Sequence, residues 1–227
     1  MDMALIKRTG KIRKILRTVY PDVKTQLNFQ NPFQLLVATI LSAQCTDKQV
    51  NQVTPVLFAT LSAPENFAKA DIDVISRLIR STGYYHNKAK NIKACSQMLI
   101  EKFDGKVPDT LEALVQLPGV GRKTANVVLG AVFGKPGIVV DTHVARISGR
   151  LGLTAGRNPV QIERELMDII PRKSWNTFCL RLIYFGRETC RARNPSCPVC
   201  PVRELCPFQK ESGTTGLSRD QICQYQV

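Results

Sequence analysis

The stretch LPGVGRKTANVVLG, residues 117–130, places a glycine turn directly before an Arg-Lys pair and an apolar run. Gly119 and Gly121 lack side chains and allow positive φ angles, so backbone N–H groups of the turn can point outward together. A helix that begins after the turn adds the positive end of its dipole, which favours a phosphate. An ordinary helical hairpin would use the same glycines only to turn the chain. Lys123, which follows, is then either a solvated side chain or a functional one.

Four of the eight cysteines fall within 17 residues, in the pattern C-x6-C-x2-C-x5-C. Clustered cysteines in a cytosolic protein indicate a metal site rather than disulfides. Four thiolates bind either zinc or an iron–sulfur cluster, and the spacing alone does not decide between them. The other four cysteines are scattered, and three of them lie in apolar helical segments where a reduced thiol packs as a small hydrophobe. The clustered residues are Cys190, Cys197, Cys200 and Cys206.

The composition is that of a globular protein with a basic surface. The chain has 227 residues, 44% of them hydrophobic, with 32 Lys+Arg against 18 Asp+Glu and a net charge of +14. This excess favours a polyanion as partner, most simply nucleic acid, over a protein that is merely basic. No apolar run of about 18 residues indicates a membrane span. The basic N-terminal segment lacks the features of a secretory signal, and its helical spacing of apolar residues predicts a helix that packs rather than a transit peptide.

Nearly every segment has a helical pattern, so we expect an all-α fold. Asn-Pro pairs at 31–32 and 158–159 predict capped helix starts, and the apolar run after Pro32 predicts a buried helix. A further helix is predicted over 109–117, before the glycine turn. Residues 25–135 form one series of short helices with a helix-hairpin-helix at 111–130. Residues 1–24 with 136–210 form a second helical body, and 211–227 is polar and patternless, which predicts a disordered tail.

LPGVGRKTANVVL, followed by VDTHVAR and then by the cysteine pattern, resembles the endonuclease III family of helix-hairpin-helix DNA glycosylases with a [4Fe–4S] cluster. The resemblance extends over residues 25–208, with three separate motifs in the family's order. It implies two helical domains flanking a DNA-binding cleft. The domain of 25–135 would be a six-helix barrel that carries the hairpin, and the other domain would hold the cluster on the four clustered cysteines.

The resemblance implies that Lys123 attacks the C1′ carbon of a damaged nucleotide that has left the base stack. An amine is a nucleophile only when it is neutral, and positive charge from Arg122 and the helix N-terminus favours the neutral form. Attack releases the base and leaves a Schiff base, from which β-elimination cuts the strand. Asp141 corresponds to the catalytic carboxylate, which stabilises positive charge on the sugar and helps to deprotonate the lysine. By position alone, Asp141 is the N-cap of the next helix.

Further residues match the family's DNA contacts. Gln44 would fill the gap left by the flipped nucleotide, together with Tyr84, which stands where relatives place a leucine and which otherwise packs on the neighbouring helix. Asn194, Ser196 and Phe185 depart from the usual residues of the family, which predicts altered packing without loss of chemistry. The remaining DNA contacts expected are Gly119, Val120, Gly121, Arg122, His143, Arg191 and Arg193.

These features predict a bifunctional DNA glycosylase and abasic-site lyase of base excision repair that acts on oxidised pyrimidines. Its partner would be duplex DNA with damaged bases or abasic sites, and it would act as a monomer in the cytoplasm, associated with the nucleoid. Adenine-excising relatives lack the hairpin lysine and carry a glutamate in the first barrel helix, which is absent here. Thymine- or uracil-excising relatives place tyrosine at the position of Lys123. A non-catalytic DNA-binding module would need neither Lys123 nor Asp141.

Overall fold

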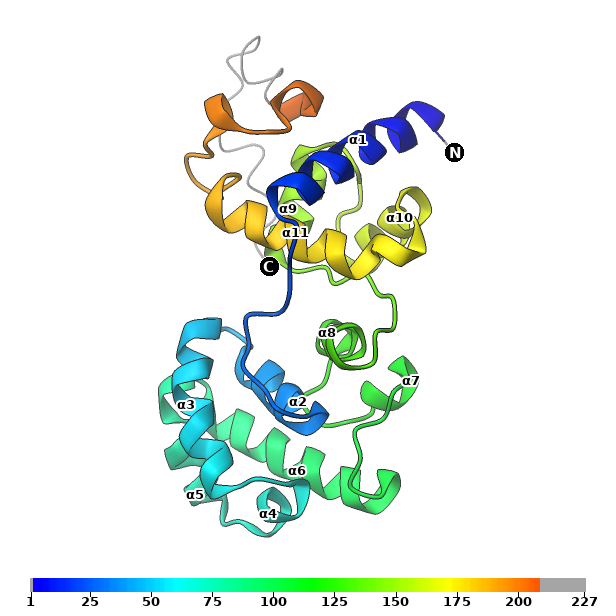
Figure 1. The fold of residues 1–227 in the computed structure, drawn as a ribbon. Coiled ribbons are helices and arrows are strands. Elements are labelled where there is room, and N and C mark those ends of the chain that lie inside the picture. Colours follow the sequence, from blue (N-terminus) through cyan, green and yellow to red (C-terminus); the bar gives the residue numbers. More distant parts are fainter. Residues whose placement is uncertain (1, 209–227) are drawn as a thin grey trace. The chain divides into compact units, whose positions relative to one another are not determined.

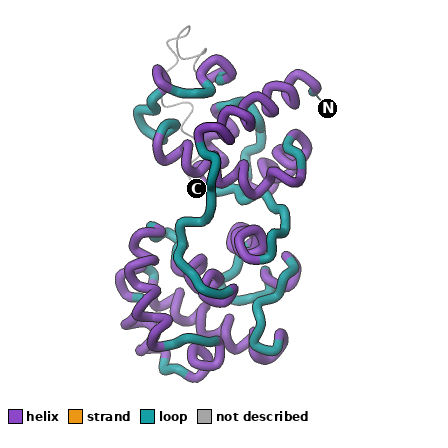
Figure 2. Tube along the Cα trace, viewed as in Figure 1, coloured by secondary structure: helices purple, strands orange, loops and turns teal. Residues whose placement is uncertain are grey.

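The computed structural model describes residues 2–208, and within that range it consists of helices and loops without a strand (Figures 1 and 2). The predicted all-α fold is therefore confirmed for these residues. The tail predicted at 211–227 lies outside the described residues. No helix in the described range is both long enough and apolar enough to cross a membrane. The chain divides into a central unit, Thr25–Lys135, and a terminal unit made of Met1–Lys24 with Pro136–Val227.

The central unit is built around one buried helix, α2 (Pro32–Leu41). Every residue from Phe33 to Leu41 is buried, which confirms the buried helix predicted from its apolar run. Asn31 caps it, since the side-chain oxygen accepts the Gln34 N–H at 2.9 Å. The helices α3, α6 and α8 pack against α2, and α4 and α5 pack against α6 (Figure 1). Their bounds are α3 Asp47–Thr60, α4 Pro64–Lys69, α5 Ile72–Leu78, η1 Arg80–Thr82, α6 Tyr85–Phe103, α7 Leu111–Leu114 and α8 Arg122–Val132.

The terminal unit joins the two ends of the chain. The N-terminal helix α1 (Met3–Val19) packs on α10 (Pro159–Ile169) and α11 (Trp175–Glu188), and α9 (Thr142–Arg150) packs on α11. Gly186 permits the contact between α9 and α11, because a Cβ there would lie 2.7 Å from both Nδ1 of His143 and Cδ1 of Ile147. Three short 3₁₀ helices complete this unit: η2 Arg172–Ser174, η3 Cys197–Val199 and η4 Arg203–Leu205.

The helix predicted over 109–117 is shorter than expected. Only Leu111–Leu114 is helical, after Thr110, whose hydroxyl caps it. The N–H groups of Gln116 and Leu117 donate to carbonyls only three residues earlier, at 3.2 and 3.1 Å. Pro118 disfavours helical geometry in the residue before it, so the chain tightens and leaves the helix there. The longer helix was wrong because the last residues before Pro118 form three-residue hydrogen bonds in place of helical ones.

Candidate functional site

The hairpin turn before α8 contains two glycines with different conformations. Gly119 has φ +78°, as predicted, and a Cβ there would lie 2.9 Å from Cβ of Asn91, so both backbone and packing require glycine. Gly121 has φ −88°, so it does not use the positive φ that a glycine allows. Nothing lies within 4 Å of where a Cβ of Gly121 would be. The fold itself therefore does not require glycine at 121, and the missing side chain leaves the turn bare.

Gly121 is the N-cap of α8, and no side chain caps this helix. Arg122 and Lys123 form its first two residues, and both are exposed. Val120, in contrast, has a side chain that is only 5% exposed in the core of the central unit, so only its backbone can meet a ligand. An uncapped helix start with two cations beside it attracts an anion, and a phosphate group fits such a position.

Asp141 begins α9 in the terminal unit. Its Oδ1 accepts the Val144 N–H at 2.8 Å, so the N-cap position predicted from the sequence is confirmed. The cap holds the carboxylate at a fixed angle. Nη2 of Arg146 lies 3.2 Å from Nδ1 of His143 and donates to the carbonyl of Cys190 at 3.0 Å. Burial and the neighbouring Arg150 charge lower the pKa of Arg146. His143 therefore lies in a fixed polar group between α9 and the start of the cysteine loop.

Gln44 and Tyr84 are both exposed and both in the left-handed region, with φ of +52° and +47°. Tyr84 is 66% exposed, so it does not pack on the neighbouring helix as the alternative required. Left-handed backbone costs a residue other than glycine about 1–3 kcal/mol, and such strain is concentrated at functional positions. The two candidates for filling a gap in DNA are therefore presented outward on strained backbone, both within the central unit.

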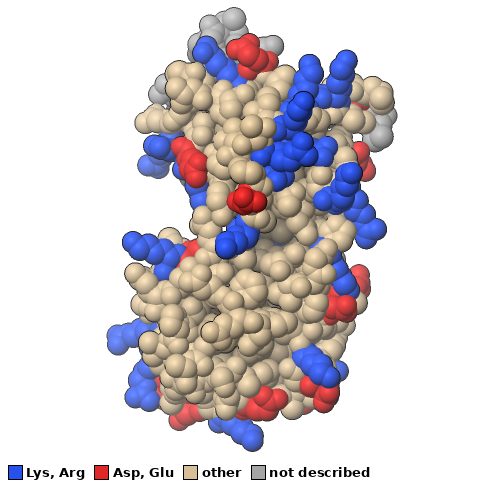
Figure 3. Space-filling view, viewed as in Figure 1, with Lys and Arg blue, Asp and Glu red and all other residues tan. Residues whose placement is uncertain are grey.

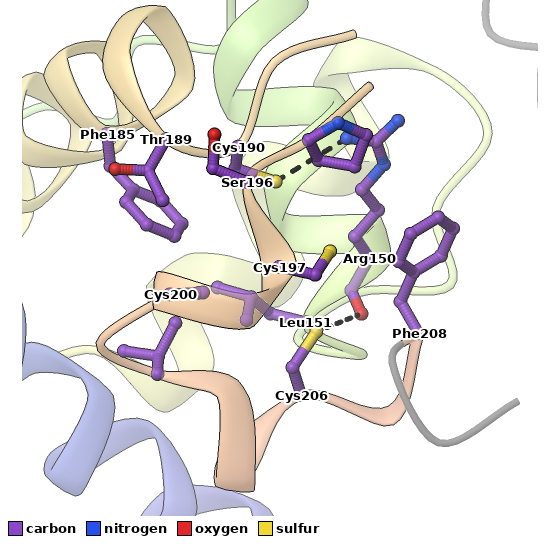
Figure 4. A pocket seen from close by; sticks show the side chains of 12 residues that line it. Arg150, Leu151, Phe185, Thr189, Cys190, Ser196, Cys197, Cys200, Cys206 and Phe208 are labelled. Carbon is purple, nitrogen blue, oxygen red and sulfur yellow. Dashed lines mark hydrogen bonds between the residues drawn. The ribbon is translucent and has the colours of Figure 1, made fainter. Parts of the chain in front are cut away.

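The four clustered cysteines line one hollow in the terminal unit (Figure 4). Apolar side chains including Leu151, Phe185 and Val202 complete its wall. Burial raises the pKa of the Cys200 thiol, so this side chain is a neutral thiol unless a metal replaces its proton. Among residues 2–208, no three Cys, His, Asp or Glu groups approach closely enough to hold a single metal ion. The hollow is the candidate metal centre because four thiols line it, and its lining contains no histidine or carboxylate.

Arg150 of α9 holds the loop that begins with the first of these cysteines. Its Nη1 lies 3.5 Å from Sγ of Cys190 (Figure 4). The same Nη1 donates to the carbonyl of Arg191 at 2.7 Å, and Nη2 donates to the carbonyl of Ala192 at 2.9 Å. The side chains of Arg191 and Arg193 are exposed. The guanidinium thus fixes the backbone of the loop while the loop's own cations face solvent. The spacing of cysteines alone did not reveal this role of Arg150.

The terminal unit also has a basic groove that the sequence patterns did not indicate, where Lys and Arg side chains gather over α1 (Figure 3). Arg13 Nη2 donates to Oγ of Ser174 at 2.7 Å, which fixes one cation in the groove. Burial and the like charge of Arg17 lower the pKa of Arg13. The run of basic residues in the first twenty positions indicated one side of this groove. The cation that α11 contributes, Arg181, is distant from that run in the sequence. The cationic lining residues are Arg13, Lys14, Arg17, Lys173 and Arg181.

Known proteins share these motifs and this fold. The family model of the HhH-GPD superfamily base excision DNA repair proteins matches residues 37–172. Endonuclease III of Synechocystis sp. is 50% identical over 207 residues, which is 91% of this chain and 94% of the relative. Endonuclease III of Escherichia coli is 41% identical over 197 residues, covering 86% of this chain and 93% of the relative.

A solved structure shows the same arrangement of helices. A non-covalent endonuclease III–DNA complex superposes with a TM-score of 0.88 at 42% identity, covering 92% of this chain and 99% of that chain. The structural similarity thus extends over most of this chain. With its hairpin lysine, its capping aspartate and its four-cysteine hollow, this chain belongs to the endonuclease III family of the HhH-GPD superfamily of base excision DNA repair proteins.

Proposed function

We propose that this protein is a bifunctional DNA glycosylase and abasic-site lyase that removes oxidised pyrimidines from duplex DNA. The observation that carries the proposal is Lys123, an exposed amine in the first turn of an uncapped helix, beside a bare glycine turn. The turn binds a backbone phosphate without reading the sequence, and this contact brings the sugar of the damaged nucleotide to the lysine. The protein acts as a monomer, and its DNA substrate gives it a nucleoid-associated location in the cytoplasm.

Lys123 is proposed to act as the nucleophile. Its neutral Nζ forms a bond to C1′ of the flipped nucleotide, and the damaged base leaves with the electron pair of the glycosidic bond. Opening of the sugar ring then gives an iminium ion between Nζ and C1′. The iminium makes the protons on C2′ acidic, and loss of one of them expels the 3′ phosphate and cuts the strand. Water finally hydrolyses the imine and releases the lysine.

Asp141 is proposed to supply the carboxylate for this reaction. Positive charge develops on the sugar as the glycosidic bond breaks, and a fixed negative charge stabilises it. The cap to Val144 uses Oδ1 and holds the group in one orientation. The same carboxylate can accept the proton that the lysine loses before attack.

Base release by a lysine differs from base release by water in one measurable respect. The parent protein is incubated with a duplex that contains one oxidised pyrimidine, in the presence of borohydride, which reduces an imine to a stable amine. We expect a covalent protein–DNA adduct and a cut strand. Base release without an adduct would identify a glycosylase that uses water, and DNA binding without base release would identify a non-catalytic module. A related endonuclease III has been trapped as a covalent intermediate with DNA, which supports the first outcome.

We also propose that Cys190, Cys197, Cys200 and Cys206 hold a [4Fe–4S] cluster. The four thiols surround one hollow without a histidine or carboxylate in its lining, and a Cys₄ set is the usual ligand set of such clusters. The guanidinium of Arg150 beside Cys190 offsets the negative charge of thiolates, and apolar side chains exclude water. When bound, the cluster would cross-link the loop through four iron–thiolate bonds. The cross-link would hold Arg191 and Arg193 in position for phosphate contacts.

The metal content tests this second proposal directly. Protein prepared without oxygen should be brown and should contain about four irons and four acid-labile sulfides per chain. Cys200→Ser should lose most of this iron. Cys179→Ala should keep it, because that thiol is buried elsewhere in the same unit. A colourless parent with stoichiometric zinc would contradict the assignment.

A further inference from the structure

Lys88 is a buried lysine that the proposed reaction does not use. It lies one turn into α6, and only 5% of its surface is exposed. Burial disfavours the charged ammonium and lowers the pKa of Lys88. A lysine is retained in such surroundings only where its N–H donors find acceptors. The identity of those acceptors therefore indicates what the residue is for.

The acceptors are two backbone carbonyls at the ends of two different helices. Nζ of Lys88 lies 2.8 Å from the carbonyl oxygen of Leu41 and 2.7 Å from that of Thr82. Leu41 is the last residue of α2, so its carbonyl is one of those that a helix leaves without a partner inside itself. Thr82 is the last residue of η1. One ammonium thus ties together the ends of two separate elements.

Each of these two helix ends is next to a loop that carries one of the two side chains predicted to insert into DNA. The Gln44 loop, residues 42–46, follows Leu41, and the Tyr84 turn, residues 82–84, begins at Thr82. Both loops present an exposed side chain on left-handed backbone. A second contact connects the same region, because Nε2 of Gln49 donates to Oγ of Ser81 at 2.9 Å. The buried lysine therefore links the ends from which the two loops start, and the Gln49–Ser81 hydrogen bond joins the neighbouring helices α3 and η1.

We propose that Lys88 is a positioning residue that joins the Gln44 loop and the Tyr84 turn into one rigid support for DNA insertion. The inference rests on the proposed function and on the prediction from the sequence that both side chains enter the gap left by a flipped nucleotide. They must enter one duplex together, so their spacing has to be set before binding, and an ordered support lowers the entropy lost on insertion. Without the ammonium, two interior carbonyls lose their shared donor, and the two loops lose the buried link between them.

The test compares two lysines of the same helix. Lys88→Met removes the link between the loops. Lys93→Met is the matched control, because Nζ of Lys93 donates at 2.7 Å to the carbonyl of Ala70, which belongs to neither loop. Single-turnover rates are measured on a damaged base in duplex DNA and on an abasic site in single-stranded DNA. The single strand has no stacked gap to fill, so strand cleavage there requires Lys123 without requiring insertion.

We expect Lys88→Met to slow excision from duplex by about 10- to 100-fold, as misplacement of positioning groups does. Its cleavage of the single-stranded abasic site should stay close to the parent rate, and Lys93→Met should leave both rates near those of the parent. A 2-aminopurine placed opposite the lesion should brighten with the parent, because insertion unstacks it, and much less with Lys88→Met. An unchanged ratio of duplex to single-strand rates in folded Lys88→Met would overturn the inference.

Failure of the proposed function has a different signature, namely a parent that releases no damaged base and cuts neither substrate. Circular dichroism and thermal melting show whether each variant is folded. If Lys88→Met does not fold, Lys88→Gln takes its place, because its amide keeps two N–H donors on a shorter, uncharged side chain. We expect a smaller selective loss on duplex from this variant. Equal losses on both substrates would assign Lys88 to stability alone.

Discussion

The helices α8 and α9 begin in opposite ways. α8 begins after Gly121, and no side chain caps it. α9 begins after Asp141, whose own carboxylate accepts the Val144 N–H. Both starts carry the partial positive charge of N–H groups that have no partner inside the helix. At α9 the chain supplies the negative charge itself, whereas at α8 it leaves that charge to an anion from outside.

The start of a helix can therefore serve two different purposes in this protein. In the proposed function, the open start receives a phosphate and presents Lys123 next to it. The self-capped start fixes the carboxylate of Asp141, whose charge is proposed to stabilise the reacting sugar. Substitutions that alter one start without altering its fold can therefore separate binding, attack and charge stabilisation.

The largest effect is expected at the open start, from Lys123→Gln. Base release and the borohydride-trapped adduct should both fall below detection, because an amide cannot form the imine. Affinity for damaged duplex should stay within a few-fold of the parent, since the turn and the basic surface remain. Lys106→Gln, at an exposed lysine of the same unit that pairs with Asp104, is the control and should keep full activity. An adduct with Lys123→Gln would show that another amine is the nucleophile.

At the self-capped start, Asp141→Asn separates the charge from the cap. Asparagine caps a helix about as well as aspartate, so the melting temperature should change little. Base release should slow by about 10²- to 10³-fold, because the neutral amide cannot stabilise positive charge on the sugar. The rate is measured in single turnover on an oxidised pyrimidine. A parental rate with Asp141→Asn would leave the carboxylate only its structural role.

The two glycines of the hairpin give a smaller but sharper contrast. Gly119→Ala should destabilise the protein by about 1–3 kcal/mol, because φ is +78° and the new methyl group meets Asn91. Gly121→Ala should change stability by less than about 1 kcal/mol, since its φ is ordinary and its surroundings are open. It should nevertheless weaken duplex binding, because a methyl group then stands where a phosphate approaches. Unfolding by urea and binding to duplex are measured for both variants. Parental affinity in Gly121→Ala would refute the phosphate contact.

The smallest effect is expected at the turn of residues 154–156, where backbone N–H groups donate hydrogen bonds to a carboxylate of the chain. Glu165 accepts the N–H groups of Ala155 and Gly156 at 2.9 and 3.2 Å, and the hydroxyl of Thr154 at 2.5 Å. The hydrogen bond from Thr154, then those from the backbone, lower the pKa of Glu165 below its ordinary value of 4.5. The charged Glu165 carboxylate therefore stabilises the folded protein fully above about pH 4.5. This stabilisation is lost as the pH falls through the lower pKa of the folded state.

Glu165→Gln removes this titration. The free energy of unfolding of the parent should exceed that of the variant at pH 7, and the difference should shrink as the pH is lowered below 4.5. Urea unfolding at a series of pH values measures it. A difference that does not depend on pH would mean that the carboxylate is not held by this turn in its charged form.

Local signals in the sequence predicted much of the fold. Asn31 and Asn158 precede prolines, and each caps its helix by accepting an N–H three residues later. The apolar run after Pro32 predicted the most buried helix of the central unit. These signals are local because a cap or an apolar stripe involves neighbours within one or two turns. The catalytic roles of Lys123 and Asp141 came from the family resemblance and remain predictions.

Contacts between distant residues could not be predicted in this way. Lys88 has the sequence context of any lysine in a helix, and its acceptors lie at Leu41 and Thr82. Gly119 and Gly121 look equivalent in the motif, yet only the first has positive φ and a crowded neighbour. In each case the physical cause is packing by a residue elsewhere in the chain, which no periodicity or spacing records.

The terminal unit is assembled from both ends of the chain, and this matters while the protein is being synthesised. α1 leaves the ribosome first, but the helices on which it packs, α10 and α11, begin only at Pro159 and Trp175. Domains fold as they are completed, so the central unit is finished while α1 still lacks its partners. Ile12 and Leu16, which are fully buried in the finished unit, stay uncovered during that interval. A nascent chain of this protein therefore carries a completed hairpin together with an apolar N-terminal helix that needs protection from aggregation.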